Sequence, residues 1–92
     1  MKARTYFGTY DVEMTKSSYS NNGNLALQLW EEDGPFATLS VNLSKLNNEH
    51  LVYLDTNNCP WAEDFVKENN LGYPMAAEAI SGFCSYPLYY IY

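Results

Sequence analysis

Apolar and polar side chains alternate near the start of the chain, a pattern typical of half-buried strands. Residues 6–14 carry Tyr10, Val12 and Met14 on one face, with polar residues between them. An Asn-Asn-Gly sequence follows at positions 21–23, and both residue types tolerate the positive φ that tight turns require. The pattern therefore predicts one strand over residues 6–14 and a turn at 21–23.

A second pair of alternating runs, residues 24–32 and 36–43, flanks an Asp-Gly-Pro sequence at positions 33–35. Gly adopts a left-handed conformation readily, so two alternating runs around such a turn predict a β-hairpin. The spacing places Leu25, Leu27, Leu29, Ala37, Leu39, Val41 and Leu43 inward, with Thr38, Ser40 and Asn42 outward.

The middle of the chain changes from strand-like to helix-like. Residues 55–59 supply capping side chains, and Pro60 suits the first turn of a helix. Asn70 or Gly72 can take the left-handed conformation that ends one. These signals predict a helix of about ten residues, 60–69. Its apolar stripe, at spacings of three and four, consists of Trp61, Ala62, Phe65 and Val66.

The chain ends in a strongly aromatic segment. Residues 75–82 favour a helical turn or a loop, and the residues after them favour a final strand. Alternation places Tyr90 and Tyr92 on one face of that strand, and Tyr89 and Ile91 on the other. Because both faces carry large apolar groups, either the strand is central in its sheet or one face is a contact surface.

These elements predict an α+β fold in a single domain, residues 1–92. We expect an antiparallel β-sheet of four to five strands with one main α-helix, about residues 60–69, packed on one face. A chain of 92 residues suits one domain. Two separate cores would each be too small to be stable.

The composition is acidic and rich in tyrosine. Eleven acidic residues against five basic ones give a net charge of −6, and nine Tyr contribute to an aromatic share of 16%. Direct binding to nucleic acid needs clustered Lys and Arg, so the charge argues against it. No apolar run approaches the roughly 20 residues that span a bilayer, and no secretory signal follows the N-terminus, so we expect a cytoplasmic protein without membrane contact.

Cys59 is the one residue with the setting of a nucleophile, since a helix N-terminus lowers the pKa of a thiol. A cysteine hydrolase also needs a base, and the single histidine, His50, lies in another loop. A capping or buried cysteine is the simpler interpretation. Cys59, Cys84 and His50 are one ligand short of a closed zinc site, and in a cytosolic protein both cysteines are expected to be reduced. We therefore expect no enzyme activity, no metal and no cofactor.

Acidic residues form two clusters, one before the turn of the predicted hairpin and one on the predicted helix. Such runs are usually solvated faces, but an array of carboxylates can also imitate nucleic-acid phosphates in front of a basic groove. The C-terminal tyrosines either pack in a sheet or form a protein interface, where Tyr is enriched at hot spots. The candidate partner-binding residues are Glu31, Glu32, Asp33, Glu63, Asp64, Glu68, Tyr89, Tyr90 and Tyr92.

Three segments carry a family resemblance. They read Pro-Phe-Ala-Thr-Leu-Ser-Val-Asn-Leu at 35–43, Asp-Thr-Asn-Asn-Cys-Pro-Trp-Ala-Glu at 55–63 and Ser-Gly-Phe-Cys-Ser-Tyr-Pro-Leu-Tyr at 81–89. Over roughly residues 24–91 the chain resembles an uncharacterised family of small domains carried by bacterial phages, plasmids and conjugative elements. That family has no established activity. The resemblance implies a context, because small acidic accessory proteins of mobile elements are often inhibitors of host defence, such as anti-CRISPR proteins.

We therefore expect a non-enzymatic acidic binding protein of mobile-element origin that inhibits a host defence or nucleic-acid-handling complex. Its partner would be a host protein with a basic, nucleic-acid-binding surface, which the carboxylates would occupy by mimicry. The alternative is a structural or assembly module that forms a homodimer through the C-terminal aromatic strand. A thiol-dependent enzyme at Cys59 is the third hypothesis.

Overall fold

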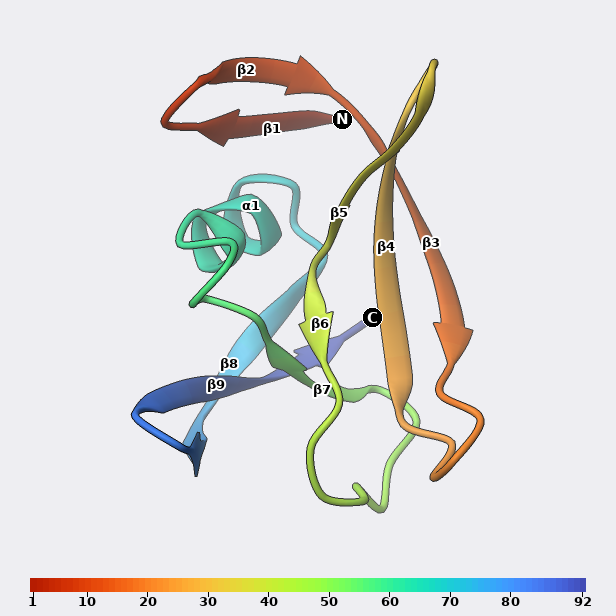
Figure 1. Ribbon diagram of the computed structural model, residues 1–92, viewed down its shortest axis with the longest axis vertical. Helices are drawn as coiled ribbons and strands as arrows, with labels where there is room; N and C mark the ends of the chain where they lie inside the picture. The colour runs from red at the N-terminus through yellow and green to blue at the C-terminus, as the bar shows by residue number, and fades with distance from the viewer.

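The computed structural model describes residues 1–92 as three antiparallel β-sheets and one short helix (Figure 1). Strands hold 54% of the residues and the helix 8%. The expected α+β fold, with one sheet of four to five strands and one main helix, is therefore wrong, and the protein is mostly β. The excess of strand comes from residues 2–5 and 72–81, which form strands that the sequence pattern does not predict.

The three sheets follow one another along the chain. β1 (Lys2–Thr5) pairs with β2 (Gly8–Asp11). The second sheet contains, in this order, β3 (Glu13–Ser18), β4 (Leu25–Glu31) and β5 (Gly34–Thr38). The third has the order β6-β7-β9-β8, from β6 (Ser40–Val41), β7 (Leu51–Leu54), β8 (Gly72–Ser81) and β9 (Cys84–Ile91), and α1 (Ala62–Glu68) connects β7 to β8.

The predicted single strand over residues 6–14 is two strands of different sheets. The chain turns at residues 6–7, runs through β2 and enters β3 directly after Val12. Val12 is buried and donates its N–H to Met1 O (2.8 Å), while the terminal ammonium of Met1 donates to Val12 O (2.9 Å). The alternation itself holds, because the apolar residues that it placed on one face are buried or half-buried.

The predicted hairpin is confirmed, with β4 and β5 as its strands. Its turn consists of Glu32 and Asp33, and Gly34 already pairs with Glu31. Gly34 has a φ of 144°, a conformation that favours glycine. The inward-facing leucines of β4 include two that are fully buried, as the alternation predicts.

The strand that follows the hairpin changes sheet at Leu39. The Leu39 N–H donates to Leu27 O (2.9 Å) in the three-stranded sheet, whereas the Leu39 C=O accepts from the Asp55 N–H (2.8 Å) beside the four-stranded sheet. The Leu27 N–H therefore lacks the backbone carbonyl that an antiparallel partner would supply. The Oγ atom of Ser40 accepts it instead (3.0 Å) and also bonds to the Tyr19 hydroxyl (2.9 Å). The outward prediction for Ser40 is wrong, since only 3% of this residue is exposed.

A network of asparagine side chains holds the loop after β6. Asn24, which is 6% exposed, donates to Ser44 O (3.0 Å) and accepts from the Leu46 N–H (2.9 Å). Asn42 Oδ1 accepts from the amides of Asn22 (3.1 Å) and Asn24 (3.3 Å). Asn42 is therefore half-buried, and the outward prediction is wrong for it as well.

The helix α1 spans Ala62–Glu68 and is therefore shorter at both ends than the predicted range 60–69. Asp55 caps the turn before it and not the helix itself, since Asp55 Oδ1 accepts from the Asn58 N–H (3.1 Å). After the helix, Asn70 adopts the predicted left-handed conformation with a φ of 52°. The helical residues that are buried are Ala62, Phe65 and Val66, as the stripe predicts.

The prediction of a helical turn or a loop at residues 75–82 is wrong, because most of this segment belongs to β8. β8 pairs with β9, and a register shift between Pro74 and Glu78 marks a bulge. Ala76, inside the bulge, has a φ of 55°, which is uncommon for a residue with a Cβ atom. The bulge and the alanines hide the strand from a period-two pattern, so β8 is recognisable only by its pairing with β9.

The predicted final strand is confirmed as β9, which lies centrally between β7 and β8. Tyr89 and Ile91 point into the core with 0% and 1% exposed, whereas Tyr90 and Tyr92 lie on the opposite face. A Cβ atom at Gly72 would lie 2.0 Å from Tyr90 O, so glycine permits the close approach of β8 to β9 at this point.

One hydrophobic core joins the sheets and the helix. In Figure 1 the four-stranded sheet lies in the lower half, with α1 above β8 and β9 and the three-stranded sheet to the right. No helix is long and apolar enough to cross a membrane. The largest fully buried side chains come from both larger sheets and from α1, and they are Leu27, Leu29, Leu39, Val52, Leu54, Phe65, Val66, Tyr89 and Ile91.

Replacing Ser40 by alanine should lower the free energy of unfolding by about 1–3 kcal/mol, because the Leu27 N–H then stays buried without an acceptor. Tyr19→Phe removes one hydrogen-bond partner of the Ser40 hydroxyl but keeps that hydroxyl as the acceptor for the Leu27 N–H. This variant should therefore lower the free energy of unfolding by less. Ser17→Ala, on the exposed strand β3, is the control and should change stability by less than about 0.5 kcal/mol. Urea unfolding followed by circular dichroism measures all three variants, and a Ser40→Ala variant as stable as the wild type would contradict this role.

Candidate functional site

The first cluster of acidic residues lies at the tip of the β4–β5 hairpin. Glu31 ends β4, and Glu32 and Asp33 form the turn, so the chain reversal leaves all three side chains exposed. The structure holds two ion pairs, and neither involves these residues. The tip is therefore a charged surface that the chain itself does not neutralise.

Strand pairing extends this cluster by two acidic residues that the sequence reasoning missed. Glu13 lies opposite Trp30 in the β3–β4 register, one position away from Glu31. Alternation indicates that Glu13 faces outward, but only the register shows which neighbours it has. We call the group Asp11, Glu13, Glu31, Glu32 and Asp33 the acidic ridge. A hollow of about 460 Å³ along it is lined by Met1, Asp11, Val12, Glu13, Trp30, Glu31 and Glu32.

The indole of Trp30 is the main apolar group of the acidic ridge and is 40% exposed. Its Nε1–H donates to Thr15 Oγ1 (2.7 Å), which fixes the plane of the ring. Lys2 pairs with Asp11 (2.6 Å), and this hydrogen bond and charge hold the pKa of Asp11 below its usual value. Asp11 is thus partly neutralised, whereas the other four carboxylates of the ridge have no cation.

The second acidic cluster, on α1, does not join the acidic ridge. The Tyr89 hydroxyl donates to Glu63 Oε1 (2.8 Å), and burial together with this bond raises the pKa of Tyr89. Glu68 pairs with Arg4 (3.2 Å). Asp64 is exposed and lines a separate hollow of about 240 Å³ with Arg4. Two of the three helical carboxylates are therefore engaged within the chain, and the two clusters line different hollows.

The three tyrosines predicted to contact a partner lie on two faces of β9. Tyr89 is fully buried, so it packs in the core and is inaccessible to a partner. Tyr90 stacks on His50, with ring centroids 4.9 Å apart, and on Tyr73, with centroids 5.1 Å apart. Tyr92 lies 5.8 Å from Tyr73 by the same measure. Sequence reasoning missed Tyr73 because this residue lies between the predicted helix stop at residues 69–72 and the segment 75–82, in a stretch where no strand was predicted.

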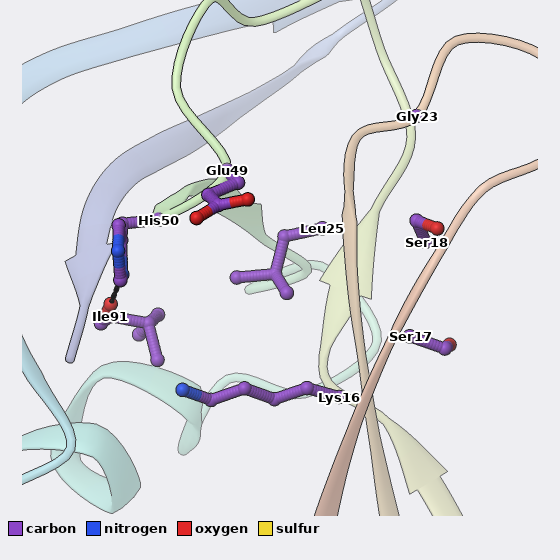
Figure 2. A pocket seen from close by; sticks show the side chains of 8 residues that line it. All are labelled: Lys16, Ser17, Ser18, Gly23, Leu25, Glu49, His50 and Ile91. Carbon is purple, nitrogen blue, oxygen red and sulfur yellow. Dashed lines mark hydrogen bonds between the residues drawn. The ribbon is translucent and has the colours of Figure 1, made fainter.

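His50 also lines a hollow of about 440 Å³ between β3 and the end of β9 (Figure 2). Its Nδ1 atom lies 2.8 Å from Ile91 O, so this nitrogen is engaged in a hydrogen bond with the backbone. Lys16 extends from β3 and donates from Nζ to Tyr92 O. The two serines of the hollow point away from the imidazole in Figure 2, so no hydroxyl nucleophile faces His50. The lining residues are Lys16, Ser17, Ser18, Gly23, Leu25, Glu49, His50 and Ile91.

Cys59 lacks the setting that its sequence position suggests. Its side chain is buried, with Sγ 3.6 Å from Thr38 O. Burial, and then the charge of Asp55, raise the pKa of Cys59 to about 11. The simpler interpretation, a buried cysteine, is therefore confirmed, and the lowered pKa of the nucleophile alternative is not found. His50 precedes β7, whereas Cys59 follows it, and the His50 ring contacts Ile91 O and Tyr90 instead of the thiol. Cys84 is likewise a free thiol, and no group of three or more His, Cys, Asp or Glu side chains is placed to hold a metal ion.

At pH 8 we expect a thiol reagent such as DTNB to modify Cys84 and to leave Cys59 unmodified. A pKa of about 11 leaves roughly one thiolate in a thousand at that pH. The native Cys84→Ser variant should therefore react far more slowly than the same variant in denaturant. Equal rates in the two states would contradict the buried position of Cys59.

No curated protein and no solved structure matches the chain. A family match covers residues 13–92, which leaves the β1–β2 hairpin outside it. The predicted resemblance to an uncharacterised family of small domains is confirmed by this match. The chain belongs to the family described as a domain of unknown function, DUF4313.

Proposed function

We propose that this protein is a non-enzymatic binding protein that docks on a basic surface of another protein through the acidic ridge. The observation that supports this proposal is the β3–β4 register, which places Glu13 with Trp30 and Glu31 on one hollow. Three of the carboxylates that line this hollow, those of Glu13, Glu31 and Glu32, form no ion pair and share the hollow with an exposed aromatic ring. A surface of this kind attracts cations and repels phosphates.

Arginine is the side chain that fits the acidic ridge best. Its planar guanidinium bonds to carboxylates through two parallel N–H groups and stacks on aromatic faces. Trp30 offers such a face in a fixed orientation, with Glu13 opposite it in the strand register, and Glu31 lines the same hollow. Stacking of a cation on an exposed ring contributes about 0.5–1 kcal/mol, which adds to the attraction by the carboxylates.

The proposal includes the setting that the family resemblance implies, a cytoplasmic inhibitor of mobile-element origin. Its partner would be a host complex whose nucleic-acid-binding groove is rich in Lys and Arg. Because the acids of α1 face other neighbours, the mimicry of phosphates rests on the acidic ridge alone. The net charge of −6 favours a protein partner over nucleic acid itself.

Reversing two charges of the ridge in a Glu31→Lys/Glu32→Lys variant should weaken binding to an arginine-rich peptide about tenfold. Each exposed ion pair contributes about 0.2–1 kcal/mol, and the new lysines also repel the peptide. Fluorescence anisotropy of a labelled peptide at physiological salt measures the dissociation constant, which should rise further as salt is added because exposed charges are screened.

The matched control is Glu49→Lys/Glu78→Lys, which changes the net charge by the same amount at exposed sites outside the ridge. Its affinity for the peptide should stay within about twofold of the wild type, since charges more than roughly 8–10 Å away are screened. If the control loses as much affinity as the ridge variant, the peptide senses only net charge, and the proposal is wrong.

A bacterial lysate tests the inhibitor setting separately. Immobilised wild-type protein should retain basic nucleic-acid-binding proteins, and the Glu31→Lys/Glu32→Lys variant should not. Added duplex DNA should displace the retained proteins, because DNA and the ridge would compete for one groove. Retention that DNA leaves unchanged would rule out occupation of a nucleic-acid-binding groove.

A further inference from the structure

The four-stranded sheet has an outer face that no other layer of the fold covers. The inner face carries the core residues of β7 and β9, and α1 and the three-stranded sheet pack on that side. Side chains alternate along each strand, so the positions between the core residues form the outer face. None of its side chains is buried, and they are Val41, Leu51, Tyr53, Tyr73, Tyr86, Leu88, Tyr90 and Tyr92.

This outer face carries no Lys, Arg, Asp or Glu in a chain whose net charge is −6. Two charged side chains, Lys16 and Asp55, lie beside it, and the chain engages both. Lys16 donates to Tyr92 O, and the carboxylate of Asp55 accepts from the side chain of Asn58 (2.9 Å). An apolar, aromatic centre with a polar rim is the usual anatomy of a protein interface.

We propose that a second copy of this chain binds to the outer face, with the two faces in contact. The distribution of charge favours this occupant. Figure 1 shows the tip of the β4–β5 hairpin at the upper end of the longest axis, whereas the four-stranded sheet lies in the lower half. Two copies that meet face to face keep each acidic ridge on the far side of its own subunit, so the repulsion between ridges is screened.

The rings of the outer face are already ordered before a second copy arrives. His50, Tyr90 and Tyr73 form a continuous stack, with interplanar angles of 18° and 22°. Because the stack fixes these side chains, their burial loses little rotamer entropy on association. Tyr73 is 44% exposed and Tyr92 is 56% exposed, so these two rings have the most area left to bury.

The size of the face sets the expected strength of the dimer. Four strands at a spacing of about 4.8 Å, along the roughly 26 Å of the eight-residue β9, give a face of about 500 Å². That area is smaller than the approximately 800 Å² per partner of a standard interface, so we expect a reversible dimer that dissociates on dilution. The dimer would carry two acidic ridges on opposite outer sides, and it does not depend on what the ridges bind.

Sedimentation velocity of the full chain from about 10 μM to about 1 mM, the range in which weak complexes dissociate, tests the proposal. The weight-average mass should rise from monomer toward dimer across this range. A Tyr73→Lys/Tyr92→Lys variant should remain monomeric throughout, because four like charges would then be brought together within the interface. Circular dichroism should be unchanged, since both side chains are largely exposed.

The matched control is Tyr6→Lys/Phe7→Lys, which replaces two other exposed aromatic residues, 88% and 91% exposed, by the same charges. This variant should dimerise like the wild type. A wild-type chain that stays monomeric up to the highest concentration overturns the proposal. So does a dimer that persists in Tyr73→Lys/Tyr92→Lys, or one that both variants abolish equally. The single variant Tyr92→Ser, which adds no charge, should weaken dimerisation severalfold and guards against a folding defect in the double variant.

Discussion

The change of sheet at Leu39 is the constraint on which the rest of the structure depends. A strand that leaves one sheet for another withdraws a carbonyl from its old partner, and the partner's N–H must then find a new acceptor within the core. Ser40 supplies that acceptor through its hydroxyl, directly beside the crossing point. The three-stranded sheet can therefore lie against the four-stranded sheet, and this arrangement separates an inner face with the core from an outer face with the tyrosines.

The elements that the sequence predicts correctly are those that local signals determine. The β4–β5 hairpin has alternation and a turn glycine, and Asn70 ends α1 as a left-handed cap. The elements that it misses depend on distant partners. β8 is Ala-rich and interrupted, and it becomes a strand because β9 lies beside it. Ser40 and Asn42 are polar at alternating positions, yet both are drawn inward because buried groups need hydrogen-bond partners.

The candidate site shows the same difference between features that local sequence predicts and features that depend on distant partners. The exposure of Glu31 at a turn follows from the sequence, whereas its proximity to Glu13 follows from the strand register. The period of two correctly separates Tyr89 from Tyr90, but only the packing of α1 and the three-stranded sheet shows that the face with Tyr89 is the buried one. At Cys59 the expected helix-terminus effect is outweighed by burial, which a sequence pattern does not measure.

β8 is an edge strand of its sheet, and ten regularly extended residues there would offer unpaired backbone groups to other chains. The bulge between Pro74 and Glu78 interrupts that row of groups, and Pro74 has no N–H to donate. Ala76 also turns the backbone away from the extended conformation. The middle of this edge strand therefore pairs poorly with a strand of another chain, which obstructs the growth of fibres. The irregularity in β8 acts as protection against aggregation in a chain that is otherwise dominated by sheets.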